Sequence, residues 1–348
     1  MTTLQKMRAY TYTTHGSPAS VLHLATDHPA PSSPTATQIL VKVAYASLNP
    51  VDYKLLTSSL ARPIVKKPCI PASDFSGVVV EAGAESGFKT NDHVYGKQSA
   101  AKFIRGSSGS LAGIFPCKYL LVESVQVVLK PNTTSFVDAA SFSLAGLTAL
   151  QTWKAGKLAE GARVLIVGAS GGVGTFAVQI AKAKKAYVVA VCSGANAALV
   201  KSLGADEVID YAKHPRLVEY LVSLNKPFDL VFDVVGKDDS LYYQSHRFLA
   251  PEKPFLFIAT DIGVSSLASE AMKRVLPGFL GGGKRPYILV YLQETPLDFK
   301  EFDQLVRDKK VKAVIDSVWE FEDAVGAFEK LMKGHAKGKI IVKVAGDL

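Results

Sequence analysis

The feature that most constrains the fold is a glycine-rich turn between an apolar segment and a helical one, in RVLIVGASGGVGTFAVQIAK at residues 163–182. Such glycines allow a tight bend, close approach of a pyrophosphate and close helix–strand packing. Free N–H groups at the helix N-terminus attract phosphate. The spacing GxxGxxG, a variant of GxGxxG, therefore predicts dinucleotide binding, and the alternative is a close-packed turn without a ligand. The predicted cofactor-binding residues of this turn are Gly168, Ser170, Gly171, Gly172, Val173 and Gly174.

The elements on either side of this turn predict an α/β fold with two domains. From residue 163 the chain alternates apolar strands, including 187–191, 228–236 and 255–260, with helical segments, which is typical of a parallel sheet covered on both faces. The first third instead contains short strands separated by Pro- and Gly-bearing turns. The strand at 339–344 is expected to pair with this β-rich region. We therefore predict a β-rich domain from 1–131 and 288–348, with a doubly wound domain at 132–287 inserted.

The second strand of the α/β segment indicates which nicotinamide cofactor would bind. NAD sites place an acid near the end of this strand, where it holds the ribose 2′-OH. Here Cys192 and Ser193 stand at that position, and the next acid is Asp206. The pattern favours NADPH, with Ser193 and Asn196 near its 2′-phosphate. The alternative is that these two side chains only cap the next helix.

Composition excludes several other classes of protein. The net charge of +9 comes from 40 basic and 31 acidic residues that are dispersed along the chain, so we predict no nucleic-acid partner and leave peripheral membrane association open. No apolar run reaches the length of a spanning helix. Cys69, Cys117 and Cys192 are far apart, which suits a reducing compartment. A cytoplasmic location is expected, with a mitochondrial one left open.

Candidate catalytic side chains lie in two loops of the β-rich region. NPVDYK contains Asn49, Asp52, Tyr53 and Lys54, and PASDFSG contains Ser73 and Asp74. Either loop could also be a simple turn. The sequence suggests no Ser–His–Asp triad, so nucleophilic hydrolysis is not expected.

Several motifs in order resemble one family over nearly the whole chain. They are SLNPVDYK, PASDFSGVVVEAG, NDHVYG, AGLTALQTW, VLIVGASGGVG, SLGADEVIDY, FDLVFDVVG and GHAKGKIIVKV. The sequence resembles the zinc-independent quinone oxidoreductase branch of the medium-chain dehydrogenase/reductases, related to zeta-crystallin. Within it, the tail and LPGFLGGGK resemble the subgroup of the reticulon-interacting and chloroplast envelope quinone oxidoreductases.

The resemblance implies a GroES-like β-domain, a Rossmann domain and an active site between them. The resemblance also marks a departure from the zinc alcohol dehydrogenases, whose zinc-site positions fall at Asn49, Ser73 and Asp74 and near Ser141 in this sequence. Of the cysteines of their structural zinc lobe, only Cys117 lies in the corresponding region. These groups are poor zinc ligands, so no metal is expected. Without zinc the implied acceptors of hydride from NADPH are quinones and α,β-unsaturated carbonyls. A cofactor-binding regulator with little turnover and a pathway-specific enoyl reductase are the alternatives, and a homodimer is left open.

The resemblance also implies roles for individual residues. Asn49 would orient cofactor or substrate, and Tyr53 and Lys54 would polarise the acceptor or supply a proton. Around the cofactor, the implied contacts are Ser193 and Tyr211 at the 2′-phosphate, Thr148 near the nicotinamide, the Ala259–Gly263 stretch at its pocket, and Lys339 from the β-domain.

Overall fold

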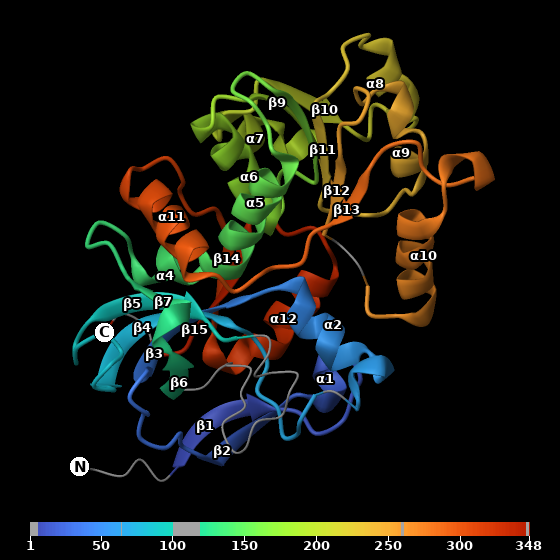
Figure 1. Cartoon of the computed structure of the whole chain (residues 1–348). Coiled ribbons are helices and arrows are strands. Elements are labelled where there is room, and N and C mark those ends of the chain that lie inside the picture. Colours follow the sequence, from blue (N-terminus) through green and yellow to red (C-terminus); the bar gives the residue numbers. More distant parts are fainter. Residues whose placement is uncertain (1–5, 64, 100–118, 259–260, 346–347) are drawn as a thin grey trace. The chain divides into compact units, whose positions relative to one another are not determined.

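The computed structural model describes residues 6–63, 65–99, 119–258, 261–345 and 348. The chain divides into two compact units (Figure 1). Unit 1 contains Met1–Ala145, Glu294–Arg307 and Lys312–Leu348, and unit 2 contains Gly146–Gln293 and Asp308–Val311. No helix in the described ranges is both long and apolar enough to cross a membrane.

Unit 1 is built on a largely antiparallel sheet in the order β14-β15-β3-β4-β5-β7, with β6 also paired to β3. The strands of unit 1 are β1 (Lys6–Thr11), β2 (His23–Pro29), β3 (Gln38–Leu48), β4 (Asp74–Ala82), β5 (His93–Lys97), β6 (Tyr119–Glu123), β7 (Val127–Leu129), β14 (Ile315–Glu320) and β15 (Lys339–Lys343), of which β1 and β2 form a separate two-stranded sheet. Its helices are α1 (Pro18–Val21), α2 (Pro50–Thr57), α4 (Phe136–Ala140), α11 (Pro296–Arg307) and α12 (Ala324–Met332), with short 3-10 turns η1 (Ser59–Ala61), η2 (Ser124–Gln126) and η6 (Phe321–Asp323).

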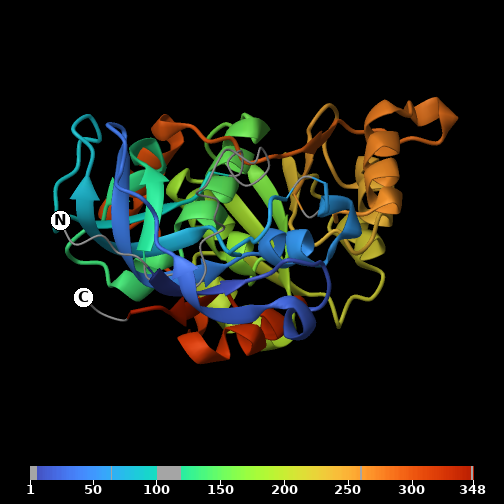
Figure 2. The ribbon, with the colours of Figure 1, turned by 90° about the horizontal axis from the view of Figure 1, so that it is seen from below.

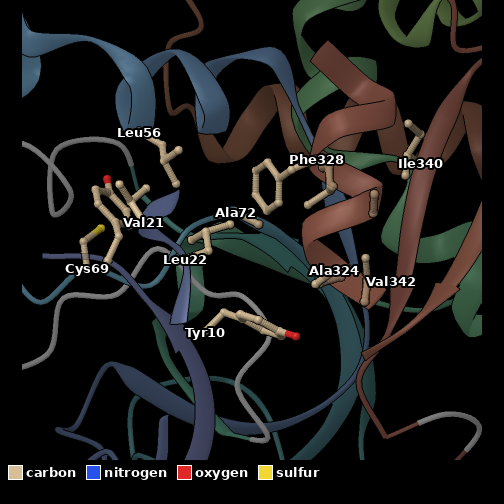
Figure 3. Close-up of a cluster of buried hydrophobic side chains, with 14 of the residues drawn as sticks. Tyr10, Val21, Leu22, Leu56, Cys69, Ala72, Ala324, Phe328, Ile340 and Val342 are labelled. Carbon is tan, nitrogen blue, oxygen red and sulfur yellow. The ribbon is translucent and has the colours of Figure 1, made fainter. Parts of the chain in front are cut away.

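The two ends of the chain meet in this sheet, as the sequence predicts. Strand β15 runs antiparallel to β3, with Ile340 opposite Leu48. The packing behind them joins residues from both ends, including Tyr10, Leu56, Phe328 and Ile340 (Figure 3). Burial of these apolar side chains stabilises the pairing of strands about 290 residues apart in the chain.

Unit 2 contains a parallel sheet in the order β10-β9-β8-β11-β12-β13. Its strands are β8 (Arg163–Val167), β9 (Tyr187–Cys192), β10 (Glu207–Asp210), β11 (Leu230–Asp233), β12 (Phe255–Phe257) and β13 (Tyr287–Leu289). The helices are α5 (Ser143–Gly156, which begins in unit 1), α6 (Gly172–Ala183), α7 (Ala197–Ser202), α8 (Leu217–Ser223), α9 (Ser240–Tyr243) and α10 (Val264–Val275), with η3 (Gly194–Asn196), η4 (Ser245–Arg247) and η5 (Gly278–Leu280).

Helices cover both faces of the parallel sheet (Figure 1). Leu165 of β8 packs in one cluster with Leu221 of α8, whereas Ile166 lies with Trp153 and Ala177 on the α5 and α6 side. Alternate residues of one strand thus face opposite layers. This arrangement confirms the predicted α/β fold class.

The units divide after Ala145 rather than after residue 131, and after Gln293 rather than after 287. Helix α4 belongs to unit 1 because Phe136 and Ala140 pack against Ala44 and Ile341, and Ser76 Oγ donates a 2.6 Å hydrogen bond to Phe136 O. The helical composition of 132–145 gives no sign of which sheet it will cover. Strand β13 extends the parallel sheet of unit 2 beyond residue 287.

Candidate functional site

Two glycines of the turn after β8 are required by packing. Gly168 has φ of +81°, and a Cβ there would lie 2.5 Å from Val235 Cγ2. A Cβ on Gly174 would overlap the carbonyl of Gly168 and lie 2.8 Å from Ala169 Cα. The first glycine therefore makes the bend, and the last lets α6 approach the strand closely.

The middle of the turn is open. A Cβ on Gly171 would meet Gly168 O at 3.4 Å, which is nearly ordinary contact. Gly171, Gly172 and Val173 are all partly exposed, and Gly171 is the N-cap of α6. The first N–H groups of a helix have no acceptor within it. This stretch can therefore donate several backbone hydrogen bonds to an anion.

The turn after β9 adjoins the glycine turn. Asn196 Nδ2 donates a 3.0 Å hydrogen bond to Ser170 Oγ, and Asn196 Oδ1 is buried without a partner in the described part of the chain. Neither Ser193 nor Asn196 caps its helix through its side chain. The N–H of Tyr211 donates to Cys192 O at 3.2 Å, which places this half-exposed tyrosine at the end of β9.

Sequence reasoning missed Asp210, which lies at the same turn. Strand β10 pairs in parallel with β9, and Asp210 is in register with Cys192. A Cβ on Gly194 would lie 3.1 Å from Asp210 Cγ. Burial, reinforced by the charge of Asp210, raises the pKa of Cys192 to about 11. The parallel pairing of EVIDY with the preceding strand was the signal that could have found this carboxylate.

The remaining predicted cofactor residues of unit 2 lie on other elements. Thr148 is buried in α5, where its carbonyl accepts a 2.8 Å hydrogen bond from Thr152 Oγ1. Gly263 is the N-cap of α10. Ala259 lies outside the described residues.

Unit 1 holds a second polar group of residues, which we call the buried polar cluster: Asn49, Asp52, Asp74 and Lys339. Asn49, at the end of β3, is 1% exposed. Its Nδ2 donates a 2.9 Å hydrogen bond to Asp74 Oδ2, and its Oδ1 accepts one from Lys339 Nζ. Asp74 Oδ1 accepts a 3.0 Å hydrogen bond from Leu144 N. The side chain of Asn49 is thus held from both ends.

The cluster contains two carboxylates and one ammonium. Lys339 Nζ lies 3.1 Å from Leu48 O and 3.5 Å from Asp74 Oδ2. Asp52 Oδ2 accepts a 2.7 Å hydrogen bond from Asn49 N. Burial raises the pKa of Asp74 and lowers that of Lys339, and it raises the pKa of Asp52 to about 7. Near neutral pH the carboxyl group of Asp52 is therefore close to half protonated.

The groups at the positions that correspond to zinc ligands do not fit a zinc ion. They offer the Asn49 amide, the Asp74 carboxylate and the hydroxyls of Ser73 and Ser141, and Lys339 brings a positive charge to the same carboxylate. Zinc prefers thiolate, imidazole and carboxylate ligands. Across the described ranges, no group of three or more His, Cys, Asp or Glu side chains could hold a metal.

Tyr53 and Lys54 both lie on α2, directly after Asn49. Both side chains are partly buried. Tyr53 packs against the hydrophobic cluster that contains Leu56 and Phe328, so its ring is fixed by the core. Because Asn49 is the N-cap of α2, its position sets where the helix starts and therefore where Tyr53 and Lys54 lie.

Models of two known families match the chain. The alcohol dehydrogenase GroES-like domain matches residues 35–132, and the zinc-binding dehydrogenase model matches residues 203–342. These ranges correspond to much of the first sheet and to the second half of the chain.

Individual proteins match over most of their length. A zinc-type alcohol dehydrogenase-like protein of Schizosaccharomyces pombe is 38% identical over 341 residues, 96% of either chain. A trans-enoyl reductase of Aspergillus terreus is 37% identical, over 88% of this chain and 86% of its own. The solved structure of a quinone oxidoreductase from Coxiella burnetii superposes with a TM-score of 0.77 at 29% identity, covering 97% of this chain and 99% of that one.

Proposed function

Since the chain belongs to the medium-chain dehydrogenase/reductase superfamily and is an oxidoreductase that uses a nicotinamide cofactor, we propose that it transfers hydride from NADPH to a quinone or an α,β-unsaturated carbonyl compound. The observation that carries the proposal is the open glycine turn. Its residues are partly exposed, the first N–H groups of α6 have no acceptor within the helix, and the buried Asn196 Oδ1 beside it has no partner in the described part of the chain. Together these groups can bind a polar ligand.

In this proposal, the N–H groups of Gly172, Val173 and Gly174 bind the pyrophosphate, because the helix N-terminus presents donors and partial positive charge there. Ser193 and Tyr211 bind the adenosine phosphate, and Asn196 joins the two turns through its bond to Ser170. Asp210 opposes this preference, since its carboxylate would repel a phosphate nearby. The preference for NADPH over NADH is therefore moderate.

The acceptor class follows from the chemistry of the groups in unit 1. Their donor set does not fit a Lewis-acidic zinc, so hydrogen bonds must stabilise the charge that develops on the acceptor. Conjugated acceptors delocalise that charge and therefore need the least stabilisation by the protein. When bound, the cofactor supplies the hydride, and one proton must reach the acceptor.

We assign the candidate proton-donating and polarising groups to Tyr53 and Lys54, which extend from a helix fixed by the core. The buried polar cluster then has a positioning role. Asn49 is hydrogen-bonded to both Asp74 and Lys339 and so fixes the start of α2. Lys339 is 3% exposed, which favours this positioning role over direct contact with the cofactor.

The test is steady-state oxidation of NADPH and NADH by the purified protein with a panel of quinones, enones and simple ketones. Turnover of a quinone or an enone, with NADPH preferred and simple ketones unreactive, is expected. Tight NADPH binding without turnover of any acceptor would favour a regulatory protein instead. Activity confined to enoyl thioesters would favour an enoyl reductase, a reading that the relative from Aspergillus terreus supports.

A further inference from the structure

Helix α2 of unit 1 leads into a stretch of chain that carries positive charge and no negative charge. Residues 53–73 contain four basic side chains and no acidic one. Residues 1–26 contain no acidic side chain either, and α1, which belongs to them, lies beside α2. Figures 1 and 2 show these two helices, both in blue, next to each other. Positive charge therefore collects here without a carboxylate from either segment.

Three segments of this region meet around His15. Tyr12 and Cys69 form an antiparallel bridge, in which the N–H of each donates to the carbonyl of the other, at 2.9 and 3.0 Å. The ring of His15 packs edge-on against that of Tyr12, with 5.9 Å between their centres. His15 Nδ1 donates a 3.0 Å hydrogen bond to Leu55 O near the end of α2. His15 is therefore fixed between α2 and the chain that leads to Cys69.

Two permanent cations of the basic stretch act on His15. Burial lowers the pKa of His15, and the charges of Lys67 and Arg62 lower it further. Burial also lowers the pKa of Lys67, and the charge of Arg62 adds to this effect. Within the described residues, no carboxylate acts on His15 or Lys67, and neither Lys67 nor Arg62 forms an ion pair. Like charges held together without a counter-charge attract an anion.

The second ring nitrogen of His15 also lacks a partner. Nε2 is buried, and no donor or acceptor reaches it in the part of the chain that the structure describes. Buried polar atoms are nearly always hydrogen-bonded, because an unpaired one costs free energy. A protonated Nε2 donates a hydrogen bond. The imidazole and the two cations therefore call for the same kind of ligand, an acceptor of hydrogen bonds that carries negative charge.

We propose that His15, Arg62 and Lys67, which we call the cationic cluster, bind a phosphate group carried by the conjugated acceptor. This inference rests on the proposed function, because α2 also carries Tyr53 and Lys54. A phosphate monoester has nearly two negative charges at neutral pH, which match the permanent charges of Arg62 and Lys67, whereas a carboxylate has one. Guanidinium binds phosphate through two parallel hydrogen bonds, and an ammonium binds it as a point charge.

Positions along the chain limit the length of such an acceptor. Arg62 follows Tyr53 by nine residues, and the helix continues to Thr57. A helix rises 1.5 Å per residue and extended chain at most about 3.6 Å, so the two Cα atoms are less than about 25 Å apart. The acceptor we infer has its conjugated carbonyl group at one end and its phosphate on an arm within this limit.

A phospholipid headgroup has the same phosphate chemistry, but the depth of the cluster favours a small molecule. Arg62 is exposed, Lys67 is partly buried, and His15 Nε2 is buried. Membrane surfaces are bound by several basic side chains that are all exposed on one face. A group at the end of a flexible arm can enter between Arg62 and Lys67, whereas a flat lipid surface meets only the outermost cation.

The test uses two enones that differ only in a phosphate or a hydroxyl at the end of the same alkyl arm, in a series of arm lengths. NADPH oxidation and calorimetric binding are measured for the wild type, Arg62→Gln, Lys67→Gln and the control Lys66→Gln. Lys66 is exposed, and its charge is not among those that act on His15.

At the best arm length, kcat/KM of the wild type should be at least about 10-fold higher for the phosphate than for the hydroxyl. Arg62→Gln and Lys67→Gln should each remove most of this advantage, and Lys66→Gln should keep it. NADPH affinity and melting temperature should stay the same in all three variants, because the substituted side chains make no ion pair in the described chain.

Three results would overturn the proposal. Equal kcat/KM and equal affinity for the two enones at every arm length would show that no phosphate is recognised. A phosphate advantage that persists in Arg62→Gln and in Lys67→Gln would place the phosphate elsewhere. Flotation with phosphatidylcholine vesicles containing phosphatidic acid, lost in Arg62→Gln and kept in Lys66→Gln without any advantage of the phosphate enone, would identify a lipid headgroup as the ligand.

Failure of the proposed function would look different. In that case no enone or quinone would be turned over, and the calorimetric comparison of the phosphate and hydroxyl enones would still test the cationic cluster.

Discussion

The glycine turn of unit 2 and the buried polar cluster of unit 1 are both polar, yet they differ in how their hydrogen-bonding groups are used. In the cluster, Asn49, Asp74 and Lys339 satisfy one another away from water. At the turn, Asn196 Oδ1 has no partner in the described part of the chain, and the first N–H groups of α6 have no acceptor within the helix. Buried groups that satisfy each other hold a structure in place, whereas unused groups at an open turn are available to a ligand.

The largest effects on stability and NADPH affinity are expected in the glycine turn, where two substitutions should distinguish a packing role from a ligand-binding role. Gly174→Ala places a methyl group against the backbone of Gly168 and Ala169, so it should lower the melting temperature by several degrees and NADPH affinity by about 100-fold or more. Gly171→Ala fits the free protein and should weaken NADPH without changing the melting temperature. Thermal unfolding and calorimetric titration measure both. If the two variants lost the same amount of stability, Gly171 would have a packing role like that of Gly174 rather than a role in ligand binding.

Removing the ammonium of the cluster should cost the next largest amount. Lys339→Met leaves Asp74 charged and buried, which lowers the free energy of unfolding by about 3–5 kcal/mol. Lys343→Met on the same strand is the control, because its 3.5 Å pair with Glu320 is solvent-exposed and should contribute under about 1 kcal/mol. Urea unfolding distinguishes the two. A loss in Lys339→Met no greater than in Lys343→Met would contradict the closed cluster.

Asp52 should make stability depend on pH. Its pKa is about 7 in the folded chain and about 3.9 when unfolded, so the folded state holds this proton more tightly. The stabilisation is complete below about pH 4 and is lost as pH rises through 7. Between pH 5 and 8 the wild-type chain should lose roughly 2–3 kcal/mol that Asp52→Asn does not lose. Unfolding at both pH values tests this, with exposed Asp27→Asn expected to follow the wild type.

The smallest effects concern the choice of cofactor at the turn after β9. Ser193→Asp should weaken NADPH about 10- to 100-fold and spare NADH, because a second carboxylate would repel the 2′-phosphate. Asp210→Asn should act in the opposite direction, by a few-fold. Dissociation constants for both cofactors give the answer. If Ser193→Asp weakened both cofactors equally, Ser193 would not lie at the phosphate.

The sequence predicted most of the fold because its signals are local. The strand–glycine–helix pattern at 163–182 identified the start of the parallel unit. The alternation of strands and helices after it predicted a parallel sheet covered on both faces. The boundary after Ala145 was not predictable in this way, since α4 reads as a helix whichever sheet it covers. Its place was decided by Phe136 packing against residues near both ends of the chain.

The candidate site divides in the same manner. Gly168 to Gly174, Ser193 and Asn196 were predicted from their order along the chain. Asp210 was missed because the argument followed β9 alone, while the carboxylate arrives from the next parallel strand. The clamp on Asn49 joins positions about 290 residues apart, and no local pattern reports such a contact.

By itself the amino-acid sequence determined which backbone can bend sharply after β8 and which segments become strands or helices, because conformational preference and apolar periodicity act over a few residues. Only the tertiary structure decided that Lys339 neutralises Asp74, that Asp210 lies next to Gly194 at the turn after β9, and that α10 buries its charges and exposes its apolar stripe. Charge pairing and burial depend on which distant groups the fold brings within a few ångströms, and that selection is made by packing of the whole chain.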